Sequence, residues 1–570
     1  MSLATFSCSH RTSDSMSRTC SLGTSLEWVA HVGQQRLFED TTATMVTMAA
    51  MAPMTAARTK RNGYFRAVKN TRKNTILHTL IVQHVIMVPP VRNLASTISS
   101  RARATAVAGL SRCIHASEHA TLRSLAGRDV VFFVPAWPEV DGSAAGVRTA
   151  RLAAAFQEWG CRVAFSSAAS RTVHTERLES LGYRTFALPL NDAMEARHVL
   201  EATEPDMAIF DRFYTEEALS HAVRSMRPRV LRMLDMQDCH ALRLARQRTV
   251  EAGGSIVDSM HVRPAATDTS LARELSAIHR SDLTLVCSTV EERWLRETCG
   301  VPAHKLAYAP LFAASEELLP ARALGFERRS GFVSLGTFRH APNVDAARFL
   351  AREVWPRVRA TLPEATVTII GSHPSREHVR LLQRPEVGMY MEGHATATRL
   401  ASALGEARVL LAPLRFGAGL KGKVAEAWAY GTPVATSPIG SEGMLSADWR
   451  AEESAVEAAA ETAAVDGGWG GLWQSTEADS LARDAARLHS DARLWERCSS
   501  RGRALCRTLF DEESLFEQLH RSVAHALTTL RERRAADYPA AMLWHHRQRS
   551  TDFFSRWIEA KNAQKDSPSG

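Results

Sequence analysis

Glycines, lysines and a glutamate are combined in one stretch of the chain, RFGAGLKGKVAEAWAYGTPVATSPIGSEGM. Gly417, Gly419, Lys421 and Lys423 lie where an apolar run gives way to an alanine-rich helical pattern. Glycines let backbone N–H groups approach an anion closely, and a helix N-terminus adds the positive end of its dipole. Glu426, about one turn inside the helix, can accept hydrogen bonds from the vicinal hydroxyls of a ribose. The stretch predicts a cradle for a sugar nucleotide, although residue types alone leave open an ordinary corner with a solvated Glu and Lys pair.

The elements around this stretch must hold the charged groups on one side of a sheet. The apolar run before the glycines and the segment TPVATS after the helical pattern are typical of buried strands, so the order is strand, loop, helix, strand. Within the helix, Val424, Ala427 and Trp428 have the i, i+3, i+4 spacing of a buried stripe. Glu426 therefore points elsewhere, on a face shared with Lys423.

The same stretch resembles the donor-site signature of the glycosyl transferases group 1 family, which are retaining, family 4-like enzymes with the GT-B fold. The signature reads P-x-x-x-G-x-G-x-K-x-K-x-x-E-x-x-x-x-G-x-P-V. The resemblance implies that Lys421 and Lys423 neutralise a departing diphosphate, which makes Lys421 a catalytic candidate, and that Glu426 holds the ribose. Many relatives carry a further glutamate where this chain has Ala418. The matching residues are Pro413, Gly417, Gly419, Lys421, Lys423, Glu426, Gly431, Pro433 and Val434.

Further donor-site candidates follow the first strands predicted in the same half. GFVSL predicts a strand ending at Gly336, and Arg339 in the next turn could meet a diphosphate with the bidentate geometry of a guanidinium, unless it is a surface charge. Gly371 follows the predicted strand ATVTIIGS, where the family's nucleotide approaches. Together with Arg415, these residues complete the predicted donor-binding set.

The first half of the chain offers a second set of candidates, in the run LDMQDCHALRLAR. Related sequences have D-x-x-D-x-H-x-L-R here, and some family members place a His or Asp near this point beside the reacting sugar. His240 could hydrogen-bond a sugar hydroxyl and Asp238 could accept the acceptor's proton, so both are catalytic candidates. The alternative is that Asp238 caps a helix and leaves His240 exposed in its first turn.

A glycine-containing loop follows the first predicted strand, VVFFVP. Gly142, Gly146 and Arg148 resemble the family's N-terminal glycine-rich loop, which touches donor phosphate or acceptor. A G-x-x-x-G before a helix is a weak signal by itself, because any tight strand-to-helix turn can need glycine.

Two local patterns late in the first half carry expectations of their own. Residues 250–268 are expected to form a flexible loop. In STVEERWL, Ser288 is expected to cap a helix with support from Glu291 three residues on.

Strands alternate with helical segments from Asp129 onward, which implies an α/β fold of doubly wound parallel sheets. With the resemblance, we expect two Rossmann-like domains that face each other across a cleft, as in GT-B enzymes. The expected organisation is a basic leader at 1–125, an N-terminal acceptor domain at 126–318, a C-terminal nucleotide-sugar domain at 319–510, a terminal helix returning to the first domain at 511–535, and a tail at 536–570.

The positive charge of the chain is concentrated in the leader. Its 15 Lys and Arg against 5 Asp and Glu give a surplus of 10, so the remaining residues carry about 9 − 10 = −1, which argues against nucleic acid as a partner. The acid-poor composition is typical of a mitochondrial or plastid transit peptide or of disorder, and a cytoplasmic location stays open. The apolar run at 75–88 is short for a bilayer crossing, so a signal anchor is disfavoured, while a membrane surface stays open as a partner. Nine unpatterned cysteines favour reduced thiols and an intracellular compartment.

No Asp-x-Asp pair occurs in the chain, although the other common glycosyltransferase fold uses that motif to bind a divalent ion. We therefore expect no metal and no cofactor, with lysines, arginine and a helix dipole meeting the diphosphate charge. The expected partners are a nucleotide-diphosphate sugar and a glycan, lipid or small-molecule acceptor. Two alternatives stay open: an inactive nucleotide-sugar-binding protein, because Ala418 replaces the first glutamate, and a sugar-nucleotide epimerase.

Overall fold

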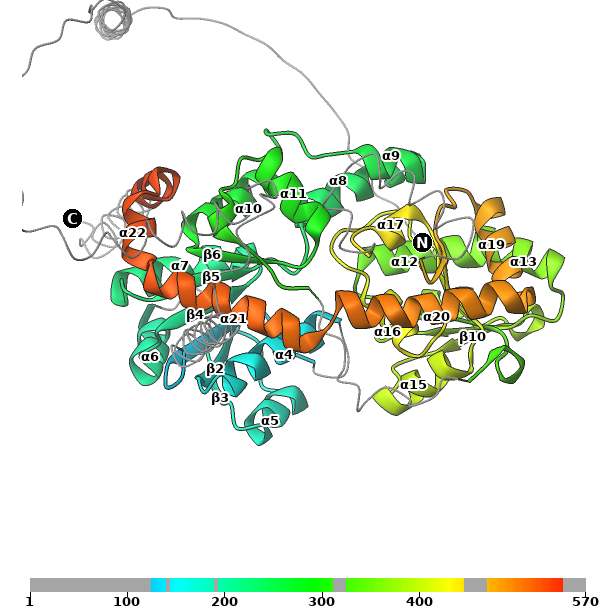
Figure 1. Ribbon diagram of the computed structural model, residues 1–570, viewed down its shortest axis with the longest axis horizontal. Coiled ribbons are helices and arrows are strands. Elements are labelled where there is room, and N and C mark those ends of the chain that lie inside the picture. The colour runs from blue at the N-terminus through cyan, green and yellow to red at the C-terminus, as the bar shows by residue number, and fades with distance from the viewer. Residues whose placement is uncertain (1–124, 140–143, 189–192, 311–323, 445–468, 547–570) are drawn as a thin grey trace, which may run out of the picture. The chain divides into compact units, whose positions relative to one another are not determined.

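The computed structural model describes residues 125–139, 144–188, 193–310, 324–444 and 469–546. These residues form two parallel sheets with helices packed on their faces (Figure 1). Nearly all of the predicted leader lies outside the described residues, as does the loop glycine Gly142.

The first sheet has seven strands in the order β3-β2-β1-β4-β5-β6-β7, and neighbouring strands are parallel throughout. Along β1, Val130 and Phe132 belong to one core cluster, whereas Val131 and Phe133 belong to the other, because successive side chains of a strand point to opposite faces. Strands buried on both faces read as continuous apolar runs, which explains the clear signal of VVFFV. The strands are β1 (Asp129–Val134), β2 (Arg162–Ser167), β3 (Arg184–Ala187), β4 (Met207–Asp211), β5 (Leu231–Asp235), β6 (Leu283–Val286) and β7 (Leu306–Tyr308).

The helices of this half connect successive strands and cover both faces of the first sheet. α4 begins at Ala144, shortly after β1. The helices are α4 (Ala144–Glu158), α5 (Val173–Ser180), α6 (Ala193–Thr203), α7 (Phe213–Met226), α8 (His240–Glu251), α9 (Ile256–His261), α10 (Thr269–Arg280) and α11 (Thr289–Glu297), with a short 3-10 turn at Ala303–Lys305.

The predicted flexible loop at 250–268 is wrong, because it contains α9. Ser255 and Asp258 form a capping box: the Asp258 N–H donates to Ser255 Oγ at 3.1 Å, and the Ser255 N–H donates to Asp258 Oδ2 at 2.8 Å. Ser288 occupies the predicted N-cap position of α11, but the predicted side-chain capping bond is wrong. Ser288 precedes α11 without a side-chain capping bond, and Glu291 is buried and directed toward other elements.

The second sheet has six parallel strands in the order β10-β9-β8-β11-β12-β13. Its two faces again have separate cores: Val409 and Leu411 pack on one side, Leu410 and Ala412 on the other. The strands are β8 (Phe332–Leu335), β9 (Val367–Ile370), β10 (Met389–Glu392), β11 (Val409–Ala412), β12 (Val434–Thr436) and β13 (Gly471–Leu472).

The helices of the second half begin with a nearly continuous run, in which α12 and α13 are joined by a π-helical segment, Leu350–Val354. Short 3-10 turns lie at Phe326–Arg328 and Pro385–Val387. The helices are α12 (Ala341–Phe349), α13 (Trp355–Thr361), α14 (Arg376–Leu382), α15 (Ala397–Glu406), α16 (Gly422–Ala429), α17 (Pro438–Ser441), α19 (Ala478–Ser490) and α20 (Ala492–Leu509).

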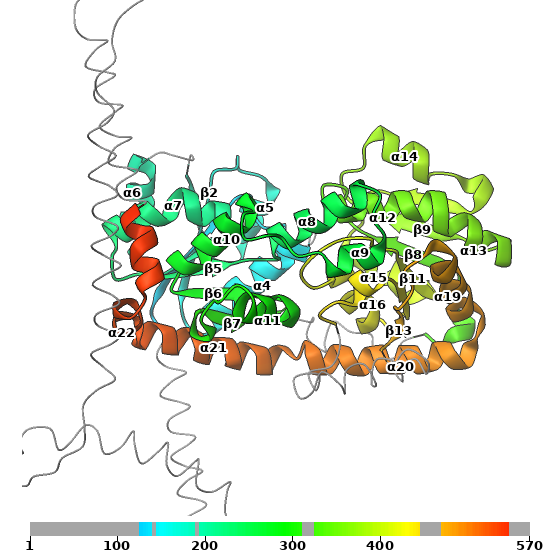
Figure 2. The same cartoon turned by 90° about the horizontal axis from the view of Figure 1, so that it is seen from above.

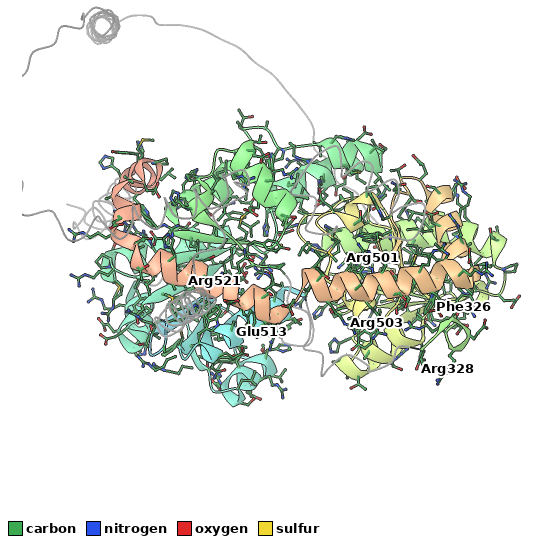
Figure 3. The ribbon with its side chains drawn as sticks, in the orientation of Figure 1. Phe326, Arg328, Arg501, Arg503, Glu513 and Arg521 are labelled. Carbon is green, nitrogen blue, oxygen red and sulfur yellow. The ribbon has the colours of Figure 1, made fainter. Side chains whose placement is uncertain are left out.

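The last helices connect the second half back to the first. α20 packs on α16, and the following α21 (Glu512–Thr528) contributes Leu519 and Val523 to the core beneath β1. α20 and α21 follow one another in line in two perpendicular views (Figures 1 and 2). Charged side chains such as Arg501 and Arg521 extend from these helices (Figure 3). α22 (Leu530–Ala535) follows α21.

In the tail, Trp544 is buried, with the guanidinium carbons of Arg224 and Arg232 lying 4.8 and 4.9 Å from its ring centre. The six described cysteines are free thiols. Within the described part of the chain, no helix is both long and apolar enough to cross a membrane.

Candidate functional site

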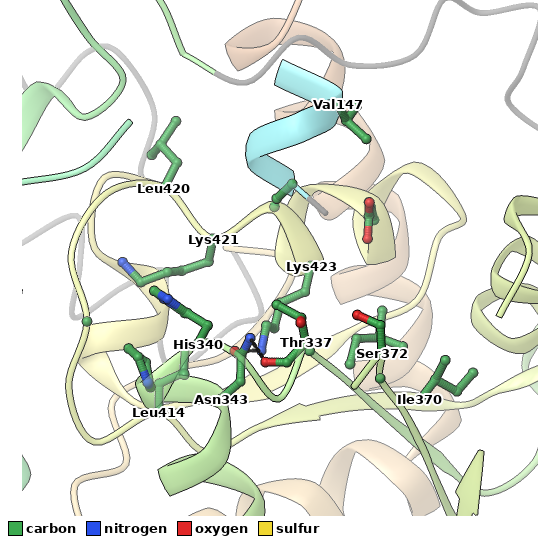
Figure 4. A pocket seen from close by; sticks show the side chains of 18 of the residues that line it. Val147, Thr337, His340, Asn343, Ile370, Ser372, Leu414, Leu420, Lys421 and Lys423 are labelled. Atoms are coloured by element: carbon green, nitrogen blue, oxygen red, sulfur yellow. Dashed lines mark hydrogen bonds between the residues drawn. The ribbon is translucent and has the colours of Figure 1, made fainter. Parts of the chain in front are cut away.

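A cavity of about 250 Å³ lies at the carboxyl ends of the second sheet's strands. We call it the α16 cavity, because the first turn of α16 forms one wall (Figure 4). The segments that follow β8, β9, β10 and β11 form most of the rest, and Ala144 and Val147 of α4 reach it from the first half. Ligands in parallel α/β folds gather at this edge of the sheet. Its polar lining includes Thr337, His340, Asn343, Ser372, Lys421, Lys423 and Glu426.

The N-terminus of α16 is suited to an anion. Lys421 occupies the N-cap position, and no side chain caps the helix. Lys421, Gly422 and Lys423 all line the cavity. The N–H groups at the start of a helix have no partner within the helix, and they carry the positive end of its dipole. Backbone donors and two ammonium groups therefore converge on one wall.

The two lysines are held at this wall by hydrogen bonds to the protein. Lys423 Nζ donates to Asn343 Oδ1 at 2.8 Å (Figure 4), and Lys421 Nζ donates to the Gly419 carbonyl at 2.5 Å. Burial lowers the pKa of both. The pKa of Lys423 falls to about 8, although Glu426 opposes the shift. An anion placed in the cavity would favour the charged ammonium groups and so reverse this effect.

Glu426 lines the same cavity one turn into α16, with its side chain open to the solvent that fills the space. The protein walls raise the pKa of this carboxyl above its usual value, and Lys423 opposes the shift. The side chain is exposed within the cavity, so solvent weakens this shift and favours the carboxylate. A carboxylate there can accept hydrogen bonds from a pair of hydroxyls.

Glycines bring the backbone close to the cavity at the positions predicted from sequence. Gly336, Gly371 and Gly417 all lie in its wall. A Cβ atom on Gly371 would lie 2.1 Å from the Gly336 carbonyl oxygen, so no other residue fits without moving the main chain. The close approach of these two segments shapes the floor at the ends of β8 and β9.

A second cavity, of about 400 Å³, adjoins the first and has walls from both halves of the chain. We call it the α8 cavity, because His240 and Arg243 of α8 line it. It shares Thr337, His340 and Asn343 with the α16 cavity, so the two spaces are neighbours. Its charged and polar lining is Glu139, Arg148, Arg212, Gln237, Asp238, His240, Arg243, Arg339, His340 and His373.

His240 is the first residue of α8, and its ring faces two carboxylates. Nδ1 lies 3.3 Å from Asp238 Oδ1 and 3.5 Å from Glu274 Oε1. Burial alone would lower the pKa of His240, but Glu274 and Asp238 outweigh it, and the pKa ends above its usual value. Nδ1 therefore carries a proton, and Nε2 is the ring nitrogen left for a ligand.

Asp238 does not cap α8, because the N-cap is Cys239 and no side chain caps this helix. Its Oδ2 accepts a hydrogen bond from Arg243 Nε at 2.7 Å. Burial would raise the pKa of Asp238, but Arg243 and His240 hold it well below its usual value. The alternative of an Asp238 cap with an exposed His240 is therefore wrong. A carboxylate with so low a pKa is a weak base, so Asp238 is better suited to orienting His240 than to abstracting a proton.

Strained backbone is concentrated around the α8 cavity. Three of the four described non-glycine residues with positive φ line it: Arg212 at +70°, Gln237 at +63° and His373 at +59°. Such conformations cost on the order of 1–3 kcal/mol each, and they persist where the surrounding structure enforces them, often at functional sites. The Arg212 N–H, for example, donates to the Asp235 carbonyl at 2.8 Å. No sequence pattern pointed to Arg212 or His373.

Several predicted donor-site residues lie outside the α16 cavity. Arg415 is paired with Asp345, with Nε 2.9 Å from Oδ2, and lines neither cavity. Arg339 lines the α8 cavity instead; its side chain is 69% exposed and lies 3.9 Å from Glu139 Oε1. Gly419 also lines the α8 cavity rather than the α16 cavity.

Arg148 and Gly146, predicted in a phosphate or acceptor loop, have structural contacts. Arg148 is buried; its Nη1 donates to Asp235 at 2.5 Å and its Nη2 to the Ala309 carbonyl at 2.6 Å. Gly146 lies in α4, where a Cβ atom would meet the Glu139 carbonyl oxygen at 2.5 Å. These contacts tie α4 to the sheet and to the loop before it.

His340, which sequence reasoning did not single out, lies in the wall common to both cavities. Burial lowers its pKa to about 4, although Asp238 opposes the shift, so the imidazole is neutral at physiological pH. A lone His after a strand carries no sequence signal of such a position. Among the described residues, no group of three or more His, Cys, Asp or Glu side chains is arranged to hold a metal ion.

Comparison with known families gives one match. The family described as glycosyl transferases group 1 matches residues 329–465, which include β8 to β12 and the second-half walls of the α16 cavity. No curated protein is similar in sequence to this chain at a significant level.

Solved structures resemble this one in fold over about two thirds of the chain. Sucrose-phosphate synthase from Thermosynechococcus elongatus is 15% identical, with 69% of this chain and 97% of that chain covered and a TM-score of 0.48. HepE from Anabaena, solved with UDP and glucose, is 13% identical, with 70% and 100% covered and a TM-score of 0.48. A mutant of TarM from S. aureus is 9% identical, with 69% and 99% covered and a TM-score of 0.50. At 9% identity the likeness to TarM shows the fold alone, two Rossmann-like parallel-sheet domains as in GT-B proteins.

Proposed function

We propose that the chain is a glycosyltransferase of the glycosyl transferases group 1 family, whose model matches residues 329–465, and that it uses a nucleotide-sugar donor. In this proposal the α16 cavity binds the nucleotide diphosphate and the α8 cavity binds the acceptor. The acceptor is a glycan, a lipid or a small molecule. The sugar keeps its anomeric configuration, as the family resemblance implies. The diphosphate charge is met by lysines and helix dipole rather than by a metal ion.

The observation that carries this proposal is the uncapped N-terminus of α16 between two lysines. Lys421 and Lys423 both line the cavity, and burial lowers the pKa of each. Holding two positive charges close together in a buried wall is unfavourable, and a diphosphate is the kind of ligand that would offset this cost. Glu426, one turn further along, is then placed for the hydroxyls of the adjoining ribose.

The reaction exchanges two bonds at the anomeric carbon of the donor sugar. The bond from that carbon to the diphosphate oxygen breaks, and its electron pair stays on the diphosphate. A bond from the acceptor oxygen to the same carbon forms. Asp238 is too weak a base to take the hydroxyl proton, and the pKa of His240 is raised toward the protonated form. The departing diphosphate oxygen therefore receives the proton, which retention permits because both groups then lie on one face of the sugar.

The test is product formation by purified variants. Full-length protein is incubated with a mixture of nucleotide sugars and a glycan or lipid extract, and products are identified by mass spectrometry. Lys421→Ala and Glu426→Ala should abolish or greatly weaken transfer while the fold stays intact. Arg376→Ala is the matched control, because Arg376 is an exposed cation of the same half on α14. Unchanged turnover in both site variants would refute the roles assigned to Lys421 and Glu426. Loss of activity in EDTA would refute metal-independent binding of the diphosphate.

A further inference from the structure

Two side chains of the first half reach across to the loop that precedes α16. Arg246 of α8 is fully buried, and its Nη1 donates to the Gly417 carbonyl at 2.8 Å. The same guanidinium makes a bidentate pair with Glu442, with distances of 2.6 and 2.7 Å. Arg246 thereby holds the loop at its first glycine and also holds the segment after α17.

Glu291 of α11 holds the same loop at its second glycine. Its Oε1 accepts a hydrogen bond from the Gly419 N–H at 2.5 Å, and its Oε2 accepts one from the Cys239 N–H at 3.1 Å. Cys239 is the N-cap of α8, directly before His240. One carboxylate therefore joins the loop that carries Lys421 to the helix start that carries His240.

Gly419 packs closely against residues of the first half. A Cβ atom at Gly419 would lie 2.9 Å from Asp238 Cβ and 3.4 Å from Cys287 Sγ. Gly419 has a φ of +65°, which glycine adopts without steric cost. The Gly419 N–H is directed to Glu291, and this residue does not line the α16 cavity. Its role is therefore to fit the loop against the first half.

We propose that Glu291 and Arg246 are positioning residues, which set the conformation of the loop at 417–421 from the opposite domain. They thereby couple the position of Lys421 at the donor site to the position of His240. This inference rests on the proposed function of the two cavities. Neither residue touches the donor in this account. They act through Gly417 and Gly419, whose positions determine where Lys421 stands.

The coupling has a consequence for the reaction. When Glu291 and Arg246 are hydrogen-bonded to the loop, the lysines of the α16 cavity and His240 are positioned at the same time, and water is excluded from the space between them. If these hydrogen bonds were lost, the donor would still bind, but the cleft around it would close less fully. The protein would then lose more transfer to the acceptor than it loses hydrolysis of the donor by water.

Hydrogen exchange of the nucleotide-free protein tests directly whether Glu291 and Arg246 hold the loop. Glu291→Gln keeps the size of the side chain but replaces one acceptor oxygen by an amide donor, which faces either the Gly419 or the Cys239 N–H. At pH 8, where the Glu291 carboxyl is mostly ionised, we expect amide exchange in a peptide spanning 416–422 to become about tenfold faster, the effect of losing a hydrogen bond to a charged group. Glu292→Gln, on the next residue of α11 and partly exposed, should leave the exchange unchanged.

A second variant covers the case in which Glu291→Gln does not fold. Glu442→Gln weakens the pair with Arg246 from the other side, and it should also speed exchange at 416–422. Unchanged exchange in the folded variants would overturn the inference. In transfer assays, Glu291→Gln should raise the ratio of donor hydrolysis to transfer severalfold, and an unchanged ratio with normal transfer would also overturn it. If neither the wild type nor any variant transfers sugar, the proposed function fails. The exchange experiment still decides whether Glu291 and Arg246 hold the loop at 417–421.

Discussion

Lys423 should make nucleotide binding depend on pH in a defined window. Burial lowers the pKa of this ammonium from 10.5 to about 8. A shift of this size corresponds to at most about 3 kcal/mol, less the screening by solvent in the cavity. A bound diphosphate favours the charged form and raises the pKa again. Binding therefore needs the protonated lysine, and the dissociation constant of a nucleoside diphosphate should rise about tenfold between pH 7 and pH 9.

Isothermal titration calorimetry with UDP, GDP and ADP would measure this dependence. At pH 8, wild-type protein should take up about half a proton per nucleotide bound, seen as a dependence of the heat on buffer ionisation. Lys423→Arg is the matched control, because a guanidinium stays charged across this range and should make binding nearly independent of pH. A flat profile in the wild type, or binding that strengthens above pH 8, would refute the assignment of Lys423 to the diphosphate.

Three further outcomes are expected. Glu426→Gln should weaken nucleoside diphosphate binding about tenfold but leave inorganic pyrophosphate unaffected, because Glu426 meets the ribose; equal losses for both ligands in calorimetry would contradict this. Gly502→Ala should lower the free energy of unfolding by about 1–3 kcal/mol in urea, since its Cβ would lie 2.6 Å from Trp428 Cδ1 beneath α16, and an unchanged midpoint would contradict the packing. Burial and Asp238 raise the pKa of Glu291 from 4.5 to about 7, although the hydrogen bond from the Gly419 N–H opposes the shift. The folded protein then binds this proton more tightly than the unfolded chain, so this carboxyl's contribution to stability is lost as pH rises from about 4.5 to 7. Between pH 5 and pH 8, the free energy of unfolding of the wild type should fall by up to about 3 kcal/mol more than that of Glu291→Gln. The same pH dependence for both proteins in urea denaturation would contradict this prediction.

The sequence was most informative where one local pattern carried both structure and chemistry. Val424, Ala427 and Trp428 are buried as their spacing predicted, and Glu426 lies with Lys423 at the cavity wall. The parallel sheets were predictable for a similar reason, because strands buried on both faces appear as uninterrupted apolar runs.

Contacts between distant segments could not be predicted in this way. The pattern around Glu291 indicated a capping box, but the side chain is used by Gly419, which lies 128 residues later in the chain. Arg415 carries the charge expected at a phosphate site, yet Asp345 binds it. Spacing along one helix gives no information about which charged partner another element brings to it. The positive φ of Arg212 likewise depends on its bond to β5 rather than on its own residue type.

The most direct measurement is a structure of the full-length protein with a bound nucleoside diphosphate. The diphosphate should lie against the first turn of α16, with Lys421 and Lys423 turned from their present protein oxygens onto phosphate oxygens, and the ribose hydroxyls should lie on Glu426. A nucleotide bound elsewhere, or one whose phosphates point away from both lysines, would contradict it.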